Sequence, residues 1–367
     1  MIEPKDFFAA MSQHGIGLYA GVPDSLLANF SAYVDDHGGR DQHLITANEG
    51  NAVALAMGYH LSASKLAAVY MQNSGLGNSV NPLTSLADPE VYKVPMLLII
   101  GWRGEPGVKD EPQHIKQGRV TLEQLRVLEI PHWVLDAHCN VADTLDAAFA
   151  SMKQRNAPVA LVVRKNTFAK YKPQNARVET FSLDREMALD HLLRLCQDDD
   201  LIVSTTGKTS REVFELRAKH GQHQKDFLTV GGMGHTSSIA LGVAIGQPNR
   251  RVVCLDGDGS LIMHMGAMPV IANFKPKHFF HVLLNNGTHE SVGGQATSAG
   301  LIDFEKLAYA VGYAGYAMAS DATTLMQAWS QLASKEGPVL LEVKIKNGSR
   351  DDLGRPTTAP EQNKFAF

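Results

Sequence analysis

The stretch Val252-Val253-Cys254-Leu255-Asp256-Gly257-Asp258-Gly259-Ser260 is an apolar strand that runs into a Gly-Asp-Gly turn. A second apolar strand, 280–284, ends in Asn285-Asn286-Gly287-Thr288. Neighbouring parallel strands bring their carboxyl ends to one crevice, and the oxygens of Asp258 and Asn286 suit Mg²⁺ or Ca²⁺. The glycines beside Asp258 let the backbone approach an anion closely. Together the two stretches predict a site for a metal ion and a diphosphate, although each alone is also typical of an ordinary turn.

Apolar runs of strand length alternate with longer amphipathic segments along the whole chain. Residues 67–71, 96–100 and 159–163 are apolar throughout, which indicates strands buried on both faces of a parallel sheet. We therefore predict an α/β fold with mostly parallel sheets flanked by helices. The pattern lapses in the polar segment 167–184, which contains Pro173 and is interpreted as a linker.

The two sides of this linker resemble each other at three places. Residues 157–163 match 337–343 at an offset of 180 residues (338 minus 158), and Ala54 lies opposite Ala240 at an offset of 186 (240 minus 54). In the register of the second match, 71–75 falls opposite 257–261. Three matches in one order predict two similar domains. The expected boundaries are a first domain over 1–166, the linker over 167–184, a second domain over 185–348 and a C-terminal tail over 349–367.

Composition excludes several classes of partner. The chain has 367 residues and a formal charge of −4, and no stretch concentrates Lys and Arg, so we expect no nucleic acid partner. The longest apolar run, 94–101, is far shorter than the ~20 residues that span a bilayer, so no membrane association is expected. Residues 1–6 are acidic where a signal peptide is basic, which predicts a cytoplasmic protein. Cys139, Cys196 and Cys254 form no CxxC pair and are expected to be small buried hydrophobes.

Gly257-Asp258-Gly259 followed by Asn285-Asn286, with 30 residues from Gly257 to Asn286 inclusive, resembles the signature of the thiamine diphosphate enzymes. The resemblance implies thiamine diphosphate and Mg²⁺ as cofactors, with the ion ligated by Asp258, the Asn286 side chain and the backbone carbonyl of Thr288. Other residues then expected at the cofactor are Gly207, Lys208, Thr209, Met233, Gly257, Gly259 and Ser260. Lys208 can equally be a solvated lysine, and Met233 can simply fill the core.

In this family a Glu at the start of a helix in the first domain activates the cofactor through a hydrogen bond to its aminopyrimidine ring. The stretch 47–59, Ala-Asn-Glu-Gly-Asn-Ala-Val-Ala-Leu-Ala-Met-Gly-Tyr, matches that position and points to Glu49. Alone, Glu49 is an acid that the helix dipole stabilises. Because Glu49 and Asp258 lie in different halves, the resemblance implies a homodimer or higher oligomer with active sites between subunits. The chain has no room for the middle domain of larger relatives.

Further motifs resemble the phosphonopyruvate decarboxylase group of this family, over about residues 5 to 360. They are Gly21–Ser25, Gly101–Gly107, Asp110–His114, Thr205–Glu212, Gly232–His235, His289–Gln295 and Asp352–Thr358. The departures are Gly232 where Ser is usual and Ala296 where Pro is usual, and neither removes a ligand or a charge. The implied reaction, a carboxy-lyase step of phosphonate biosynthesis, converts 3-phosphonopyruvate to phosphonoacetaldehyde and CO₂.

The alternatives are a sulfopyruvate or other 2-oxo acid decarboxylase, an acetolactate synthase-like carboligase, and a regulatory protein that only binds the cofactor. Glu49 argues against the last, because a protein that only binds needs no activating acid.

The resemblance also proposes residues around the substrate. Catalytic candidates besides Glu49 are Asp24, Ser25, His114, His289 and Glu290. Asp24 or Ser25 can instead cap the next helix, His114 can be a surface residue, and the other two can be structural. Candidates for the phosphonate are Arg103, Lys109, Arg350 and Arg355, of which Arg, unlike Lys, binds such groups bidentately. Arg103 is favoured because it lies just beyond a predicted strand end that faces the expected crevice. Any of these four can also be a solvated surface charge.

Overall fold

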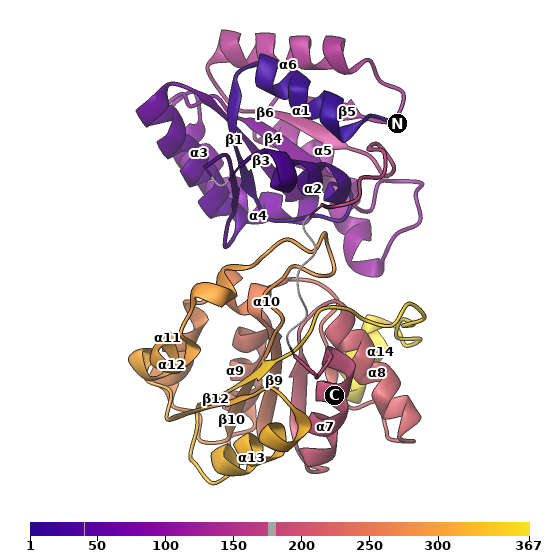
Figure 1. Ribbon diagram of the computed structural model, residues 1–367, viewed down its shortest axis with the longest axis vertical. Coiled ribbons are helices and arrows are strands. Elements are labelled where there is room, and N and C mark those ends of the chain that lie inside the picture. Colours follow the sequence, from indigo (N-terminus) through magenta and orange to yellow (C-terminus); the bar gives the residue numbers. More distant parts are fainter. Residues whose placement is uncertain (40, 175–180) are drawn as a thin grey trace. The chain divides into compact units, whose positions relative to one another are not determined.

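The computed structural model describes residues 1–39, 41–174 and 181–367. The chain divides into two compact units, Met1–Arg177 with Val292–Gln295, and Val178–Ser291 with Ala296–Phe367. Each unit is a six-stranded parallel sheet with helices on its faces (Figure 1). The predicted α/β fold with two similar domains is confirmed. None of the helices in the described ranges has the length and apolar character needed to cross a membrane.

The first unit contains a sheet of order β2-β1-β3-β4-β6-β5. Its elements are α1 (Pro4–Gln13), β1 (Ile16–Gly21), α2 (Ala28–His37), β2 (His43–Ile45), α3 (Glu49–Ala63), β3 (Leu66–Gln72), η1 (Asn73–Gly75), α4 (Leu76–Pro82), η2 (Leu83–Ala87), β4 (Leu97–Gly101), α5 (Pro112–Val127), β5 (His132–Leu135), α6 (Val141–Arg155) and β6 (Val159–Val163).

The second unit contains a sheet of order β11-β12-β10-β9-β7-β8. Its elements are α7 (Arg185–Leu195), β7 (Leu201–Ser204), α8 (Lys208–Lys219), β8 (Phe227–Leu228), α9 (Thr236–Gly246), β9 (Val252–Gly257), α10 (Asp258–Met263), α11 (Ala267–Phe274), β10 (Phe279–Asn285), η3 (Ser298–Leu301), α12 (Phe304–Val311), β11 (Gly315–Ala319), α13 (Ala322–Ala333), β12 (Val339–Lys344) and α14 (Pro360–Ala366).

The two sheets have the same strand order when the strands of each unit are counted from its own first strand. The first sheet, read from β2 to β5, and the second, read from β8 to β11, then both give second, first, third, fourth, sixth, fifth. Ala54 lies in α3 and Ala240 in α9, and each of these helices follows the second strand of its unit. The matched stretches 159–163 and 339–343 lie in β6 and β12, the last strand of each unit. The repeats seen in the sequence are therefore copies of one fold.

Burial explains why the central strands are mostly apolar. Every residue of β4 and of β10 is buried, because helices cover both faces of each sheet. Two separate clusters of buried side chains lie in each unit, and residues that alternate along one strand belong to different clusters. In β4, for example, Leu97 and Ile99 belong to one cluster and Leu98 and Ile100 to the other. A core on both sides leaves little room for polar side chains within the strands, where His281 of β10 is an exception.

The ends of the predicted linker pack on the two units. Phe168 pairs with Ile2 and is buried in the first unit, whereas Leu183 is buried in the second. The centre of the linker, 175–180, lies outside the described residues. The domain boundaries drawn from the sequence therefore stay a prediction.

The cysteines and the C-terminal tail also have defined surroundings. Cys254 is fully buried, whereas Cys139 and Cys196 are half-buried and pack against the core clusters, and all three thiols are free. The tail packs on the second unit, where Arg211 of α8 donates to the carbonyls of Leu353 and Gly354.

Candidate active site

Asp258 and Asn286 follow neighbouring strands of the second unit. β9 and β10 pair in parallel with Gly257 opposite Leu284, so the two strands end side by side. Asp258 is 3% exposed, and burial raises the pKa of its carboxyl to about 6. The Thr297 hydroxyl donates to Asp258 Oδ2 at 2.5 Å. The tips of these strands thus present a buried carboxylate beside an amide.

The Asn286 amide has a defined orientation. Its Nδ2 donates to Glu290 Oε2 at 3.1 Å, and its Oδ1 accepts from the backbone N–H of Thr288 at 3.0 Å. The Thr288 hydroxyl donates a hydrogen bond to Asn347 Oδ1. A carboxylate, an amide oxygen and a backbone carbonyl are hard oxygen donors, which is the ligand type that Mg²⁺ takes. The chemistry of these donors therefore fits the ion that the sequence motif implies.

The turn before α8 lies in the same unit as these strand tips. Gly207 has φ +92°, a conformation that side chains rarely adopt, and Lys208 Nζ donates to Glu290 Oε1 at 2.7 Å. Thr209 is buried in the first turn of α8. Lys208 is thus a partner of Glu290 rather than a freely solvated lysine.

Ser260 connects two other segments of this region. Its hydroxyl accepts from the backbone N–H of Gly234 at 3.2 Å and from the Thr205 hydroxyl at 3.2 Å. Gly234 has φ +88°, and a Cβ there would lie 2.4 Å from the His264 ring. Met233, beside Gly234, is half-buried.

His289 lies half-buried next to the Gly-Asp-Gly turn. Burial lowers the pKa of its imidazole to about 4, so the ring is neutral at neutral pH. A Cβ on Gly259 would lie 2.9 Å from His289 Cε1. Glycine at this position therefore allows the ring to lie against the start of α10.

Glu290 belongs to a chain of alternating charges. Arg185, the first residue of α7, donates to both carboxylate oxygens of Glu212 at 2.7 and 2.9 Å and to Glu290 Oε2 at 3.0 Å. Burial raises the pKa of Glu290, but Arg185 and Lys208 outweigh it and hold that pKa below its ordinary value. Sequence reasoning missed Arg185 and Glu212, although Glu212 closes one of the quoted motifs.

Glu49 is the first residue of α3 in the first unit. The Asn48 side chain caps the helix by accepting from the backbone N–H of Asn51 at 2.9 Å. Glu49 is 5% exposed, and Asn78 Nδ2 donates to its Oε2 at 2.7 Å. A Cβ on Gly75 would lie 2.5 Å from Glu49 Oε1. The carboxyl is thus held by one amide donor and packs directly against a glycine backbone.

Asp24 and Ser25 lie after β1, as expected, and Arg103 lies beside them. Asp24 is fully buried, accepts from Gln72 Nε2 and Leu26 N at 2.9 Å each, and has its pKa raised by burial. Arg103 donates to Ser25 Oγ at 2.9 Å and binds Asp110 with two hydrogen bonds of 2.8 and 2.5 Å. The first unit therefore holds a buried carboxyl, a hydroxyl and a paired guanidinium together.

The other predicted residues differ in their exposure and in their ion-pair partners. His114 lies half-buried in the first turns of α5, and Lys109 is exposed in the loop before it. Arg350 pairs with three carboxylates, those of Glu186, Glu215 and Asp352, and Arg355 is exposed in the tail. Arg103 and Arg350, predicted as phosphonate ligands, therefore already have anionic partners.

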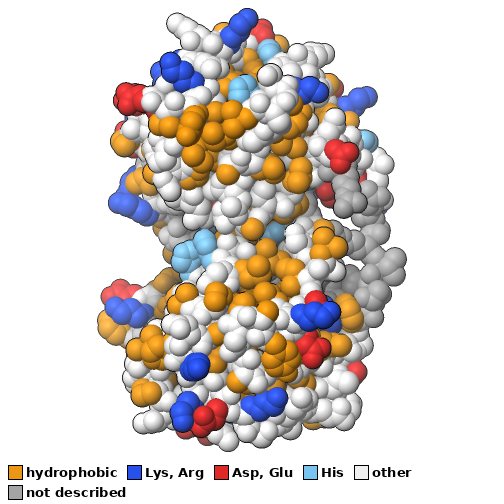
Figure 2. Space-filling view, turned by 90° about the vertical axis from the view of Figure 1, so that its left-hand side faces the viewer, with side chains coloured by type: hydrophobic (Ala, Val, Ile, Leu, Met, Phe, Trp, Pro, Cys, Tyr) orange, Lys and Arg blue, Asp and Glu red, His pale blue; other side chains and the backbone are white. Residues whose placement is uncertain are grey.

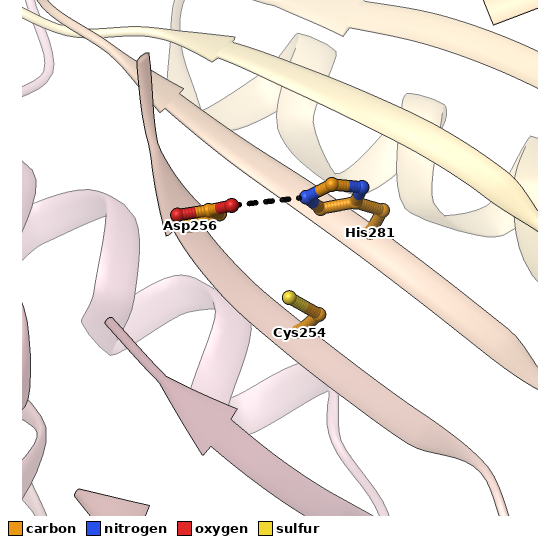
Figure 3. A group of neighbouring side chains, drawn as sticks. All are labelled: Cys254, Asp256 and His281. Atoms are coloured by element: carbon orange, nitrogen blue, oxygen red, sulfur yellow. Dashed lines mark hydrogen bonds and ion pairs between the residues drawn. The ribbon is translucent and has the colours of Figure 1, made fainter. Parts of the chain in front are cut away.

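Cys254, Asp256 and His281 form a separate polar group inside the second sheet (Figure 3). Their ligand atoms lie within 4.8 Å of one another and all three side chains are buried. His281 Nε2 lies 3.4 Å from Asp256 Oδ2, and Nδ1 lies 3.0 Å from the Tyr313 hydroxyl. Burial raises the pKa of the Cys254 thiol well above its ordinary value. Because both ring nitrogens are engaged and the thiol is protonated, we interpret this group as a hydrogen-bonded core network.

Comparison with known proteins gives two matches to family profiles. One, described as "Thiamine pyrophosphate enzyme, C-terminal TPP binding domain", matches residues 205–343. The other, "Thiamine pyrophosphate enzyme, N-terminal TPP binding domain", matches residues 5–125. The first unit thus carries the N-terminal type and the second unit the C-terminal type.

Among curated relatives, the phosphonopyruvate decarboxylase of Streptomyces viridochromogenes is 35% identical over 99% of this chain and 93% of its own. That of Streptomyces hygroscopicus is 34% identical over 99% of this chain and 92% of its own. The sulfopyruvate decarboxylase of Methanosarcina acetivorans is 26% identical over 96% of this chain and 94% of its own. The chain therefore belongs to the thiamine diphosphate enzymes, and within them it is a decarboxylase of the family that contains the phosphonopyruvate decarboxylases.

Proposed function

We propose that this enzyme decarboxylates 3-phosphonopyruvate to phosphonoacetaldehyde and CO₂, with thiamine diphosphate and Mg²⁺. The observation that carries the proposal is the identity of 35% and 34%, over 99% of the chain, to two proteins named for that activity. The relative named for sulfopyruvate is 26% identical over 96% of the chain. Sulfopyruvate is the second candidate substrate, because it has the same 2-oxo acid skeleton with a sulfonate in place of the phosphonate.

The second unit would hold the diphosphate end of the cofactor. Asp258, the Asn286 amide oxygen and the Thr288 carbonyl would ligate Mg²⁺, and their hard oxygens support this role. Mg²⁺ would in turn lower the pKa of Asp258, which without the ion is about 6 because burial outweighs the hydrogen bonds to the carboxyl. Other residues proposed to line the diphosphate are Gly207, Lys208, Thr209, Gly257, Gly259 and Ser260. Met233 is proposed to support the bent conformation of the cofactor.

Glu49 would act on the aminopyrimidine ring by holding a proton there. When bound, thiamine diphosphate supplies the electron sink that decarboxylation of a 2-oxo acid requires. Asn78 donates to Glu49 Oε2, so Oε1 is the oxygen that remains for the ring. The single amide donor and the backbone of Gly75 fix the direction of the carboxyl, which is what a positioned acid needs.

Asp24 would be the proton donor on the substrate side. Burial raises the pKa of its carboxyl and so favours the protonated form, which can give a proton where an ionised carboxylate cannot. Ser25 would orient the substrate by its hydroxyl. His289, neutral because of burial, would contribute a low-polarity wall that disfavours the substrate carboxylate, and His114 stays a further candidate.

The phosphonate would be bound by basic residues of the loop 103–110 and of the tail. Arg103 lies beside Ser25, and Lys109 adds an exposed positive charge to the same loop. Asp110 neutralises part of the charge of Arg103, so Lys109 would supply much of the attraction. Arg350 and Arg355 are the corresponding candidates in the tail.

We propose further that the enzyme works as a homodimer or higher oligomer. The helices α3 and α9 are apolar on most sides, and a helix of this kind is normally buried. Ala54, Gly58 and Leu61 are nevertheless exposed in α3, as are Gly242 and Ile245 in α9. Figure 2 shows hydrophobic side chains exposed on each of the two units. A second copy of the chain would cover these surfaces.

A comparison of turnover among three 2-oxo acids tests the proposed substrate. The purified chain with thiamine diphosphate and Mg²⁺ is given phosphonopyruvate, sulfopyruvate and pyruvate separately, and both the released CO₂ and the organic product are measured. We expect the highest kcat/KM for phosphonopyruvate, and Lys109→Met should raise its KM more than that of pyruvate. A higher kcat/KM for sulfopyruvate or for pyruvate would overturn the assignment of phosphonopyruvate as the substrate. Condensation of two keto acids in place of aldehyde release would make the enzyme a carboligase.

A further inference from the structure

Glu290 is enclosed by donors on the second unit. Its Oε1 accepts from Lys208 Nζ at 2.7 Å, and its Oε2 accepts from Arg185 and from Asn286 Nδ2 at 3.0 and 3.1 Å. The side chain is 13% exposed. Both carboxylate oxygens therefore have partners within the protein, so Glu290 is arranged to hold its neighbours rather than to react.

Two neighbours force the Asn286 amide into one orientation. A carboxylate only accepts hydrogen bonds, so the NH₂ group must face Glu290. The backbone N–H of Thr288 only donates, so the oxygen must face it, at 3.0 Å. An amide oxygen has two lone pairs, and one of them remains after this bond. Without Glu290, the Thr288 N–H is left to select the orientation alone, and an amide that turns offers NH₂, which binds no cation.

Glu290 is itself held by a buried ion pair. Arg185 is 7% exposed and Glu212 is 1% exposed, and their two hydrogen bonds of 2.7 and 2.9 Å fix the guanidinium plane. The third contact of Arg185, to Glu290, then has a defined direction. The order Glu212, Arg185, Glu290, Asn286 is a continuous path from the α7–α8 contact to the tip of β10.

We propose that Glu290 is a positioning residue, which fixes the Asn286 amide so that its oxygen is presented to the Mg²⁺ of the cofactor, and that Arg185 and Glu212 anchor it. The proposal rests on the metal role of Asn286 given above. Partners of this kind, one shell beyond a metal ligand, change metal affinity by about 10- to 100-fold when they are replaced.

Direct titration with Mn²⁺, followed by its electron paramagnetic resonance signal at a fixed excess of thiamine diphosphate, tests this on the full chain. In Glu290→Gln the amide replaces the obligatory acceptor, and we expect Mn²⁺ to bind about tenfold more weakly. Glu290→Asp keeps the charge but withdraws the oxygens from Asn286, so it should also weaken binding. Glu215→Gln is the matched control, because Glu215 is likewise ion-paired in this unit but bonds Arg350 and Gly354. It should leave the affinity unchanged.

A rescue experiment separates orientation from general damage. In Asn286→Asp both side-chain atoms are oxygens, so no partner is needed to select the ligand. Glu290→Gln should therefore weaken Mn²⁺ binding in the wild-type background but not in the Asn286→Asp background.

Three results are decisive. Wild-type affinity in both Glu290 variants overturns the proposal, and so does an equal loss in both backgrounds. If Glu290→Gln does not fold, judged by circular dichroism, Glu290→Asp carries the same comparison. If the unmodified chain itself binds no Mn²⁺, the metal role under the proposed function is wrong, which is distinguishable from a failure confined to Glu290.

Discussion

Gly75 leaves no room between η1 and the Glu49 carboxyl. Alanine there would place Cβ 2.5 Å from both Cγ and Oε1 of Glu49, so the acid must move. Since a misplacement of about 1 Å can cost on the order of 100-fold in rate, we expect Gly75→Ala to lower kcat by about that factor. Gly77→Ala is the control, because a Cβ there has nothing within 4 Å. Steady-state decarboxylation measures both, and equal activities would contradict the proposed role of Glu49.

Asp24 makes stability depend on pH in a predictable direction. Burial raises its pKa above the ordinary value of 3.8, so the folded state holds this proton more tightly than the unfolded state does. The resulting stabilisation is present below pH 3.8 and is lost as the pH rises through the raised pKa. In Asp24→Asn this contribution is absent.

The free energy of unfolding, from urea denaturation between about pH 4 and pH 8, checks this dependence. The difference between Asp24→Asn and the wild type should shift in favour of the variant as the pH rises, and then level off. A difference that stays constant over this range would show that the pKa of Asp24 is not raised.

At the scale of elements, the cap of α3 also positions the acid. Asn48 caps α3 directly before Glu49, whereas Asp321 caps α13 by accepting from Thr324 N at 2.9 Å. Removing either cap should cost about 1 kcal/mol of unfolding free energy. Asn48→Ala should lower kcat as well, because the first turn of α3 carries Glu49, and Asp321→Ala should not. Urea denaturation and turnover of both variants measure the two effects. Equal turnover in the two would mean that the cap does not position Glu49.

At the scale of the whole molecule, the proposed dimer predicts complementation between inactive chains. Glu49→Gln removes the proposed activating acid of the first unit, and Asp258→Ala removes a proposed metal ligand of the second. If each active site combines the first unit of one chain with the second unit of another, mixed dimers contain one intact site. Random pairing of equal amounts should then restore roughly a quarter of the wild-type activity.

The mixing experiment uses the two variants denatured and refolded together, with each refolded separately as the control. Activity only in the mixture supports sites shared between subunits. No activity in the mixture, with dimers present by analytical ultracentrifugation, would place both residues of a site in the same chain.

Local patterns in the chain were sufficient for the fold class and for the positions of several site residues. The uninterrupted apolar runs at 96–100 and 159–163 predicted strands buried on both faces, because only a sheet covered by helices on both sides removes every residue of a strand from water. The Gly-Asp-Gly and Asn-Asn motifs predicted where β9 and β10 end, at Gly257 and Asn285. The single stretch 47–59 predicted that a helix begins at Glu49, as α3 does.

Contacts between distant residues were decided only by the tertiary structure. Arg185 is 105 residues from Glu290 and 27 from Glu212, and no local pattern specifies that pair. Arg103 and Arg350 have the sequence character of anion ligands, yet they fold against carboxylates of their own chain. Hydrophobic periodicity is a property of neighbouring residues and is visible in the sequence. The partner of a charged side chain depends on which strand ends and helix starts the fold brings within about 3 Å.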